Sequence, residues 1–218
     1  MMLNKCLMLV LFGIGIQFGA KAQKDPKAEE ILNSVSENYK SLNGLTAEFE
    51  YTYSNTPDAP VQTNKGKVTV KGDKYRLVLD DQEIYNNGET VWTYIKSDNF
   101  KEVTINTVEE DMEELTPSNI YNIYKKGYNY KYLGEETRNG RVVQIIELNA
   151  EDRRSQFQQI TLFVDKARKY LVEWEIKDDI GGTFSYKFRE IDAQANIPDS
   201  FFVFNTKEHP DVEVIDLR

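Results

Sequence analysis

The chain has 218 residues, of which 36 are acidic and 27 basic, giving a formal net charge of −9. A nucleic-acid binder needs clustered Lys and Arg to replace phosphate counterions, and the basic residues form no such stripe, so nucleic acid is not an expected partner. The only histidine is His209 and the only cysteine is Cys6. These counts argue against Ser-His-Asp or Cys-His catalysis and against an imidazole-thiolate zinc site. We expect a protein that is not an enzyme and needs no cofactor.

The first 22 residues have the pattern of a cleavable signal peptide. Lys5 precedes an apolar run over residues 7–16, and Ala20-Lys21-Ala22 supplies a small-x-small cleavage site. The run is shorter than the ~20 residues that a membrane-spanning helix needs. We therefore expect cleavage after Ala22, export from the cytoplasm, and one domain over residues 23–218.

Hydrophobic periodicity predicts helices near the start and the middle of the chain, with strands elsewhere. Apolar residues at helical spacing indicate an amphipathic helix that begins at Pro26 and ends near Asn43-Gly44. From Leu45 the period changes to two, which indicates a strand to Tyr53, and a second helical segment is expected over residues 119–126. Further strands are predicted over residues 61–71, 75–79, 83–85, 91–95, 102–105, 128–133, 142–148, 157–164, 170–176, 183–191 and 201–204.

Turns recur about every dozen residues with no helix between most consecutive strands. This spacing favours an antiparallel meander of about eleven strands that closes toward a barrel. Asp178-Asp179 before Gly181-Gly182 could form an acid-base pair or bind a hard cation, but a tight hairpin turn is preferred. Lys and Glu on several strands discourage pairing between copies, so we expect a monomer.

The chain is rich in aromatic residues, with 11 Phe, 13 Tyr and 2 Trp. Many fall on single faces of predicted strands, as Phe49, Tyr51 and Tyr53 do. Two short helices cannot cover the inner face of so many strands, so a curved sheet either fills its interior with side chains or leaves an apolar cavity. A cavity would bind apolar ligands, because each buried methylene contributes ~0.8 kcal/mol. The residue pattern leaves both readings open.

Several motifs occur in a characteristic order. Residues 45–49 follow the first helix as Leu-Thr-Ala-Glu-Phe, and residues 66–71 precede Tyr75-Arg76-Leu77. Residues 87–94 give a turn-Gly-x-x-x-Trp-x-Tyr hairpin, and residues 160–165, 176–179, 182–184 and 202–204 continue the series. In this order the sequence resembles the outer-membrane lipoprotein carrier family, LolA, over essentially all of residues 23–218.

The resemblance implies a mainly β fold with a few helices, namely an incomplete, half-open antiparallel β-barrel covered by helices, as in LolA and LolB. It further implies a periplasmic carrier that shields the acyl chains of lipoproteins. Such a carrier takes its cargo from an inner-membrane ABC-type releasing complex and delivers it to an outer-membrane acceptor, without a cofactor.

Two alternatives keep the same fold. One is a periplasmic carrier of another lipid or hydrophobic small molecule. The other is a lipoprotein-sensing regulatory binding module. Related sensors carry an additional carboxyl-terminal domain, and this sequence ends at Arg218, which favours transport.

The resemblance also guides the choice of site residues, although ordinary core packing is an equally good reading of each. We place Tyr75 and Leu77 at the cavity mouth. The predicted lining residues are Phe49, Val68, Val70, Trp92, Tyr94, Leu162, Trp174, Phe184 and Tyr186, and the apolar underside of the lid is Ile31, Val35, Ile120 and Ile123.

One segment departs from the family pattern. Well-studied members have an arginine followed by a proline between the second and third strands, where the arginine contacts the lid. Here the segment reads Lys71-Gly72-Asp73, which leaves Lys71 and Arg76 as candidates for that contact.

Overall fold

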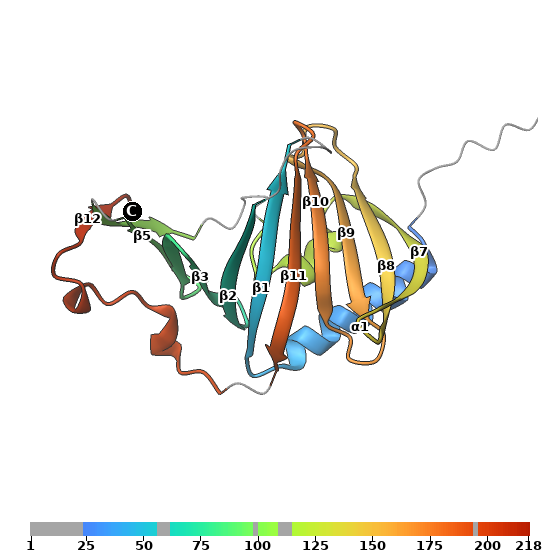
Figure 1. Cartoon of the computed structure of the whole chain (residues 1–218), viewed down its shortest axis with the longest axis horizontal. Helices are drawn as coiled ribbons and strands as arrows, with labels where there is room; N and C mark the ends of the chain where they lie inside the picture. Colours follow the sequence, from blue (N-terminus) through green and yellow to red (C-terminus); the bar gives the residue numbers. More distant parts are fainter. Residues whose placement is uncertain (1–23, 56–61, 98–99, 109–114, 194–195) are drawn as a thin grey trace, which may run out of the picture.

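The computed structural model describes residues 24–55, 62–97, 100–108, 115–193 and 196–218. The predicted signal peptide, residues 1–22, lies outside the described residues. The described residues contain one continuous sheet of twelve strands, one α-helix and three short 3-10 helices (Figure 1). Among them no helix is long and apolar enough to cross a membrane.

The elements follow the chain with short connections. They are α1 (Pro26–Ser41), β1 (Leu45–Ser54), β2 (Thr63–Lys71), β3 (Lys74–Leu79), β4 (Gln82–Asn86), β5 (Thr90–Lys96), β6 (Lys101–Thr107), η1 (Ile120–Lys125), β7 (Tyr128–Arg138), β8 (Arg141–Ala150), β9 (Phe157–Asp165), β10 (Leu171–Asp178), β11 (Thr183–Asp192), η2 (Asp199–Phe202), η3 (Thr206–Glu208) and β12 (Glu213–Asp216).

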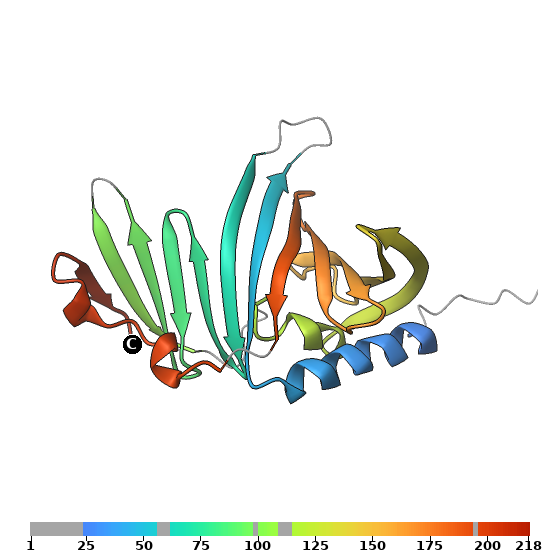
Figure 2. The same cartoon turned by 60° about the horizontal axis from the view of Figure 1, so that its bottom comes forward.

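Strand β1 joins two halves of the sheet. The strand order is β12-β6-β5-β4-β3-β2-β1-β11-β10-β9-β8-β7, and all neighbours are antiparallel except β12 and β6. The β7–β11 half curves around α1, whereas the β2–β6 half extends away from it (Figures 1 and 2). The expectation of a mainly β, incomplete barrel is confirmed, with twelve strands in place of about eleven.

Local sequence explains how α1 begins and where it packs. Asp25 caps the helix by accepting hydrogen bonds from the backbone N–H groups of Lys27 and Ala28, and Pro26 occupies the first turn, where its missing N–H is harmless. The other carboxylate oxygen of Asp25 accepts a hydrogen bond from the N–H of Tyr132 on edge strand β7. The cap therefore also fixes α1 against the sheet.

The strand predicted over residues 201–204 is wrong. Phe201 and Phe202 belong to the 3-10 helix η2, and the last strand lies further on, at β12. The apolar residues of this stretch pack as a turn: Phe202 is fully buried, and the ring of Phe204 lies 5.1 Å from that of Tyr94. A short aromatic run predicts burial equally well in a strand or in a packed turn. The helical segment predicted over residues 119–126 is present as the 3-10 helix η1.

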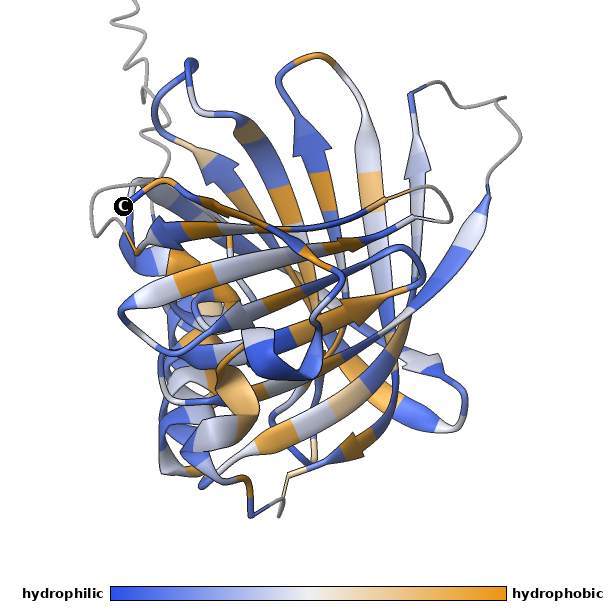
Figure 3. Ribbon diagram, turned by 90° about the vertical axis from the view of Figure 1, so that its left-hand side faces the viewer, coloured by the Kyte–Doolittle hydropathy of each residue, from blue (hydrophilic) through white to orange (hydrophobic). Residues whose placement is uncertain are grey.

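Different segments cover the two faces of the sheet. The face that contacts α1 and η1 is here called the inner face, and the opposite face is the outer face. Side chains in a strand alternate between its two faces. Figure 3 shows hydrophobic and hydrophilic residues interspersed along the strands. On the outer face of β4–β6, Tyr85, Tyr94 and Val103 form a small core with Phe204 of the carboxyl-terminal segment.

An ion cluster lies beside this outer core. Glu83 on β4 accepts hydrogen bonds from Arg76 at 2.7 Å, from Lys96 at 3.0 Å and from the hydroxyl of Tyr85 at 2.7 Å. Burial alone would raise the pKa of Glu83, but these hydrogen bonds prevail and lower it to about 2. The guanidinium of Arg76 also lies over the rings of Tyr85 and Phe201, at 4.5 and 4.8 Å from their centroids. The cluster thereby links β3–β5 to the carboxyl-terminal segment.

The lowered pKa of Glu83 makes its contribution to stability dependent on pH. That contribution is complete above the ordinary value of 4.5 and is lost as pH falls toward about 2. We expect Glu83→Gln to lower stability at neutral pH and to flatten the decrease in the free energy of unfolding between these two pH values. Urea unfolding at a series of pH values measures this, with Glu89→Gln in the exposed β4–β5 turn as the control. An unchanged pH slope in Glu83→Gln would contradict the assignment.

Candidate ligand cavity

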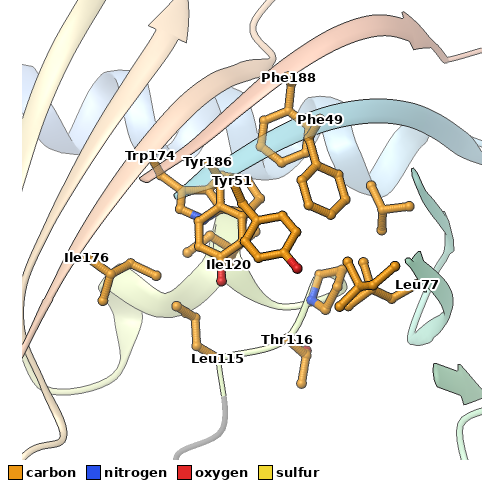
Figure 4. A pocket seen from close by; sticks show the side chains of 13 residues that line it. Phe49, Tyr51, Leu77, Leu115, Thr116, Ile120, Trp174, Ile176, Tyr186 and Phe188 are labelled. Carbon is orange, nitrogen blue, oxygen red and sulfur yellow. The ribbon is translucent and has the colours of Figure 1, made fainter. Parts of the chain in front are cut away.

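A cavity of about 150 Å³ lies between the inner face of the sheet and the segment that leads into η1 (Figure 4). Strands β1, β2, β3, β10 and β11 supply one wall, and Leu115, Thr116, Pro117 and Ile120 supply the other. The sheet residues of the lining are Phe49, Tyr51, Val68, Leu77, Leu79, Trp174, Ile176, Tyr186 and Phe188. An apolar space with few polar groups is typical of a binding pocket.

Paired aromatic rings form the wall at the junction of the two half-sheets. The β1–β11 register places Phe49 opposite Phe188 and Tyr51 opposite Tyr186, with ring centroids 5.6 and 6.1 Å apart. Trp174 on β10 lies 4.4 Å from the ring of Phe188 and 5.6 Å from that of Tyr186. Rings at these separations attract one another beyond simple area burial. The result is a stiff wall of five aromatic side chains.

Gly66 on β2 leaves the space that Phe49 occupies. A Cβ atom at this position would lie 2.4 Å from the ring of Phe49 and 2.9 Å from a methyl carbon of Leu79. Both side chains line the cavity. The absence of a side chain at position 66 therefore sets where the Phe49 ring lies.

The polar groups of the lining are uncharged. Burial raises the pKa of the Tyr186 hydroxyl, with a smaller effect from Tyr51, and burial together with Asp81 and Asp80 raises that of Tyr51. Both phenols therefore stay protonated at neutral pH. The lining residues include no Lys, Arg, His, Asp or Glu. Such a surface can bind an apolar ligand but offers no group poised to transfer a proton near neutral pH.

The structure brings some of the predicted site residues together at this cavity. Those that line it are Phe49, Val68, Leu77, Trp174, Tyr186 and, from the predicted lid, Ile120. Val70 borders an adjoining space of about 20 Å³ that shares Val68, Trp174 and Ile120 with the main cavity.

Trp92 and Tyr94 lie elsewhere, because the sheet register assigns them to the outer face. Leu77 pairs with Ile84 and Ile84 with Thr93, so Thr93 and its alternate neighbours share the inner face with Leu77. Tyr94 instead packs on Phe204 and His209, and Trp92 packs against the same outer core. The sequence shows the alternation along β5 but not which set of residues faces inward.

The remaining predicted residues are packed beside the cavity. Tyr75 is buried with the apolar residues of β1 and β2, and Leu162 with those of β7–β10. Phe184 pairs with Tyr53, ring centroids 4.5 Å apart, near the end of the β1–β11 ladder. The predicted lid residues Ile31, Val35 and Ile123 form the core between α1, η1 and β7–β10.

Sequence reasoning missed seven of the lining residues. They are Tyr51, Leu79, Leu115, Thr116, Pro117, Ile176 and Phe188. Alternation could have found Tyr51 and Phe188, which share a face with Phe49 and Tyr186. The loop residues carry no periodic signal, so their place at the cavity follows only from the tertiary structure.

The Asp178-Asp179 stretch forms a hairpin turn. The N–H of Gly182 donates to a carboxylate oxygen of Asp178 at 2.5 Å, and the N–H of Asp178 donates to the carbonyl of Gly182 at 3.0 Å. Within the described ranges, no group of three or more His, Cys, Asp or Glu side chains could hold a metal ion.

Lys71 and Arg76 both point to the outer face. Lys71 donates hydrogen bonds to the carbonyl of Ile197 and to the carboxylate of Asp199, at 2.9 and 2.7 Å, while Arg76 bonds to Glu83. The β2–β3 turn instead approaches η1 through Asp73, whose charge adds to the effect of burial in raising the pKa of Tyr121. In this structure Lys71 and Arg76 therefore contact the carboxyl-terminal segment that includes η2, rather than α1 or η1.

Residues 40–205 match the family model described as "Outer membrane lipoprotein carrier protein LolA". The chain belongs to the LolA family. An uncharacterized protein of Methanocaldococcus jannaschii is 25% identical over 201 residues, which cover 92% of this chain but 58% of that protein. This chain thus spans little more than half of that relative.

Two solved structures align with most of this chain. An uncharacterized conserved protein from Thermus thermophilus aligns with a TM-score of 0.59 at 14% identity, covering 87% of this chain and 99% of that one. The LolA superfamily protein NE2245 from Nitrosomonas europaea aligns with a TM-score of 0.42 at 13% identity, covering 81% and 97%.

The position of Gly66 predicts that a side chain there would displace the Phe49 ring and reduce the cavity volume. In Gly66→Ala the new methyl group pushes the Phe49 ring toward the open space, so we expect weaker binding of the neutral dye N-phenylnaphthylamine. Overpacking of this kind costs about 1–3 kcal/mol of unfolding free energy. Dye titration and urea unfolding measure the two effects. Lys65→Ala, on the opposite face of β2, is the control. Unchanged dye affinity in Gly66→Ala would show that Phe49 does not yield into the cavity.

Proposed function

We propose that this LolA-family chain is a periplasmic carrier that shields the acyl chains of lipoproteins and moves them from the inner to the outer membrane. The observation that carries the proposal is the apolar cavity, which has a stiff aromatic wall on the sheet and a second wall made by residues 115–120. Burial of a methylene chain there is favourable and non-directional, so the carrier needs no covalent chemistry.

The size of the cavity bears on how such cargo would enter. A cavity of about 150 Å³ holds a ligand no larger than about one benzene ring. Several acyl chains therefore require the wall to separate from the sheet. Residues 115–117 and η1 are the candidates for this movement, because a 3-10 helix is held by poorer hydrogen-bond geometry than a sheet.

The remaining parts of the proposal concern the cellular route. We propose that residues 1–22 direct export and are removed, and that residues 23–218 act as one domain and as a monomer. The carrier would accept cargo from an inner-membrane ABC-type releasing complex and pass it to an outer-membrane acceptor. Neither catalysis nor a cofactor is part of this role.

The small volume also supports a second candidate on the same fold. A single-chain lipid or another hydrophobic small molecule needs less widening of the cavity than a lipoprotein anchor with several chains. A lipoprotein-sensing regulatory module would use the same cavity with a protein partner in place of a membrane acceptor.

Copurification distinguishes these candidates. The protein is isolated from its native periplasm, analysed by native mass spectrometry and extracted with organic solvent. We expect an acylated lipoprotein to copurify. Copurification of a non-protein lipid would support a carrier on the same fold with a different cargo. An empty protein that also fails to bind acyl probes would overturn the carrier role.

A charged residue introduced at the cavity wall tests whether acyl chains bind in the cavity. Leu77→Glu places a carboxylate against the apolar lining, where it has no cationic partner among the lining residues. We expect at least a tenfold loss of affinity for acyl probes, measured by displacement of N-phenylnaphthylamine. Val78→Glu, on the outer face of the same strand, should bind as the wild type does. Equal binding by both variants would place the acyl site elsewhere.

A further inference from the structure

Two tyrosine hydroxyls interrupt the apolar lining of the cavity. Tyr51 and Tyr186 come from β1 and β11, and their rings stack with centroids 6.1 Å apart and planes 19° apart. Figure 4 shows both hydroxyl oxygens on the same side of the aromatic wall, toward Leu115 and Thr116. The third hydroxyl of the lining, that of Thr116, is paired with Ser118 at 3.1 Å.

The hydroxyls of Tyr51 and Tyr186 are left available to a ligand. Neither forms a hydrogen bond with another residue in the part of the chain that the structure describes. A phenol hydroxyl donates one hydrogen bond and accepts others, and a hydroxyl that loses water without a new partner destabilises a complex. A ligand that fills this cavity with hydrocarbon alone would remove water from both. A ligand with an oxygen atom at this point would restore a partner to each.

The surrounding charges restrict what that oxygen can be. The lining has no Lys, Arg or His to neutralise a ligand carboxylate. Asp80 and Asp81, in the β3–β4 turn, are close enough to Tyr51 for their charges to act on its hydroxyl. A carboxylate would therefore give up its hydration next to like charges, which is costly. An uncharged carbonyl oxygen accepts hydrogen bonds without this penalty.

We infer that Tyr51 and Tyr186 form a polar subsite for the ester carbonyl of an acyl chain, so that the cavity selects esterified chains over free fatty acids. The inference rests on the proposed function and adds the chemistry of the cargo to it. The aromatic wall contacts the hydrocarbon, and the two hydroxyls fix the end of the chain that bears oxygen.

Trp174 provides a reporter inside the cavity. The chain has two tryptophans, and Trp92 lies on the outer face, so Trp92→Phe leaves Trp174 as the single fluorophore of its kind. In this background, quenching of Trp174 is titrated at neutral pH with three brominated probes of equal chain length: dibromostearic acid methyl ester, dibromostearic acid and dibromo-octadecane. We expect the ester to bind at least tenfold more tightly than the acid. We expect it to bind about 5- to 150-fold more tightly than the alkane, the range that corresponds to two net hydrogen bonds.

Removal of the hydroxyls separates their role from packing. Tyr51→Phe and Tyr186→Phe keep both rings, so we expect each to weaken ester binding about 2- to 10-fold. Alkane binding should become stronger rather than weaker, because no hydroxyl at that position then loses water without a new partner. Tyr53→Phe, on the same face of β1 but outside the cavity lining, is the matched control and should change neither. Retained alkane quenching in each variant shows that the cavity is still folded.

The outcomes distinguish the two proposals. Equal affinities for ester, acid and alkane, or variants that bind the ester as the wild type does, would overturn the subsite and leave the carrier role standing. Failure of all three probes to quench Trp174 in the wild-type cavity background would overturn the carrier role itself.

Discussion

The pairing of β1 with β11 is the interaction on which the rest of the structure depends. It joins residues from opposite ends of the domain, with Thr46 opposite Asp192 and Ser54 opposite Thr183. The same pairing connects the half-sheet that curves around α1 to the half-sheet that extends away (Figure 2). It also places the paired aromatic residues of the cavity wall opposite one another on β1 and β11. The cavity therefore forms only after a non-local contact, which is the slow kind of step in folding.

Among the described residues, the two half-sheets are covered on opposite faces of the sheet. On the inner face of β7–β10, α1 and η1 supply the covering layer through residues such as Leu32 and Ile120. On the outer face of β4–β6, the carboxyl-terminal segment does so through Phe204, and Lys71 and Arg76 hold it in place. Each half thus obtains two packed layers, the usual requirement for a stable sheet. The cavity lies where the inner covering layer ends, between η1 and β3.

These features explain which parts were predictable from sequence. Strand positions follow from period-two alternation, and α1 follows from its proline, its cap and its apolar spacing. The inward residues of β1, β2 and β11 were also recognisable, because β1 alternates cleanly between apolar and polar side chains. Strand β5 was not, since Trp92 and Tyr94 are as apolar as a cavity lining and pack against a segment more than a hundred residues later in the chain. Period-two alternation identifies the two faces of a strand. Which face borders the cavity depends on segments that lie far away in the sequence.

The contrast between the two cavity walls connects the fold to a carrier's task. The sheet wall is fixed by ladder hydrogen bonds and by contacts among aromatic rings, so it can present the same surface to every cargo. The opposite wall is a loop and a six-residue 3-10 helix, which is fastened chiefly by side-chain contacts such as Ser36 to Asn122 at 2.6 Å and Tyr124 to Asn33 at 2.7 Å. Each such bond contributes only about 0.5–1.5 kcal/mol, whereas each methylene of an entering chain contributes ~0.8 kcal/mol. Four buried side chains of η1, those of Ile120, Tyr121, Ile123 and Tyr124, also belong to the core, so an entering chain must bury comparable apolar area to separate this wall from the sheet. Under the proposed function, the cargo would supply this apolar area as it enters, and the wall would return to the core once the chain has left.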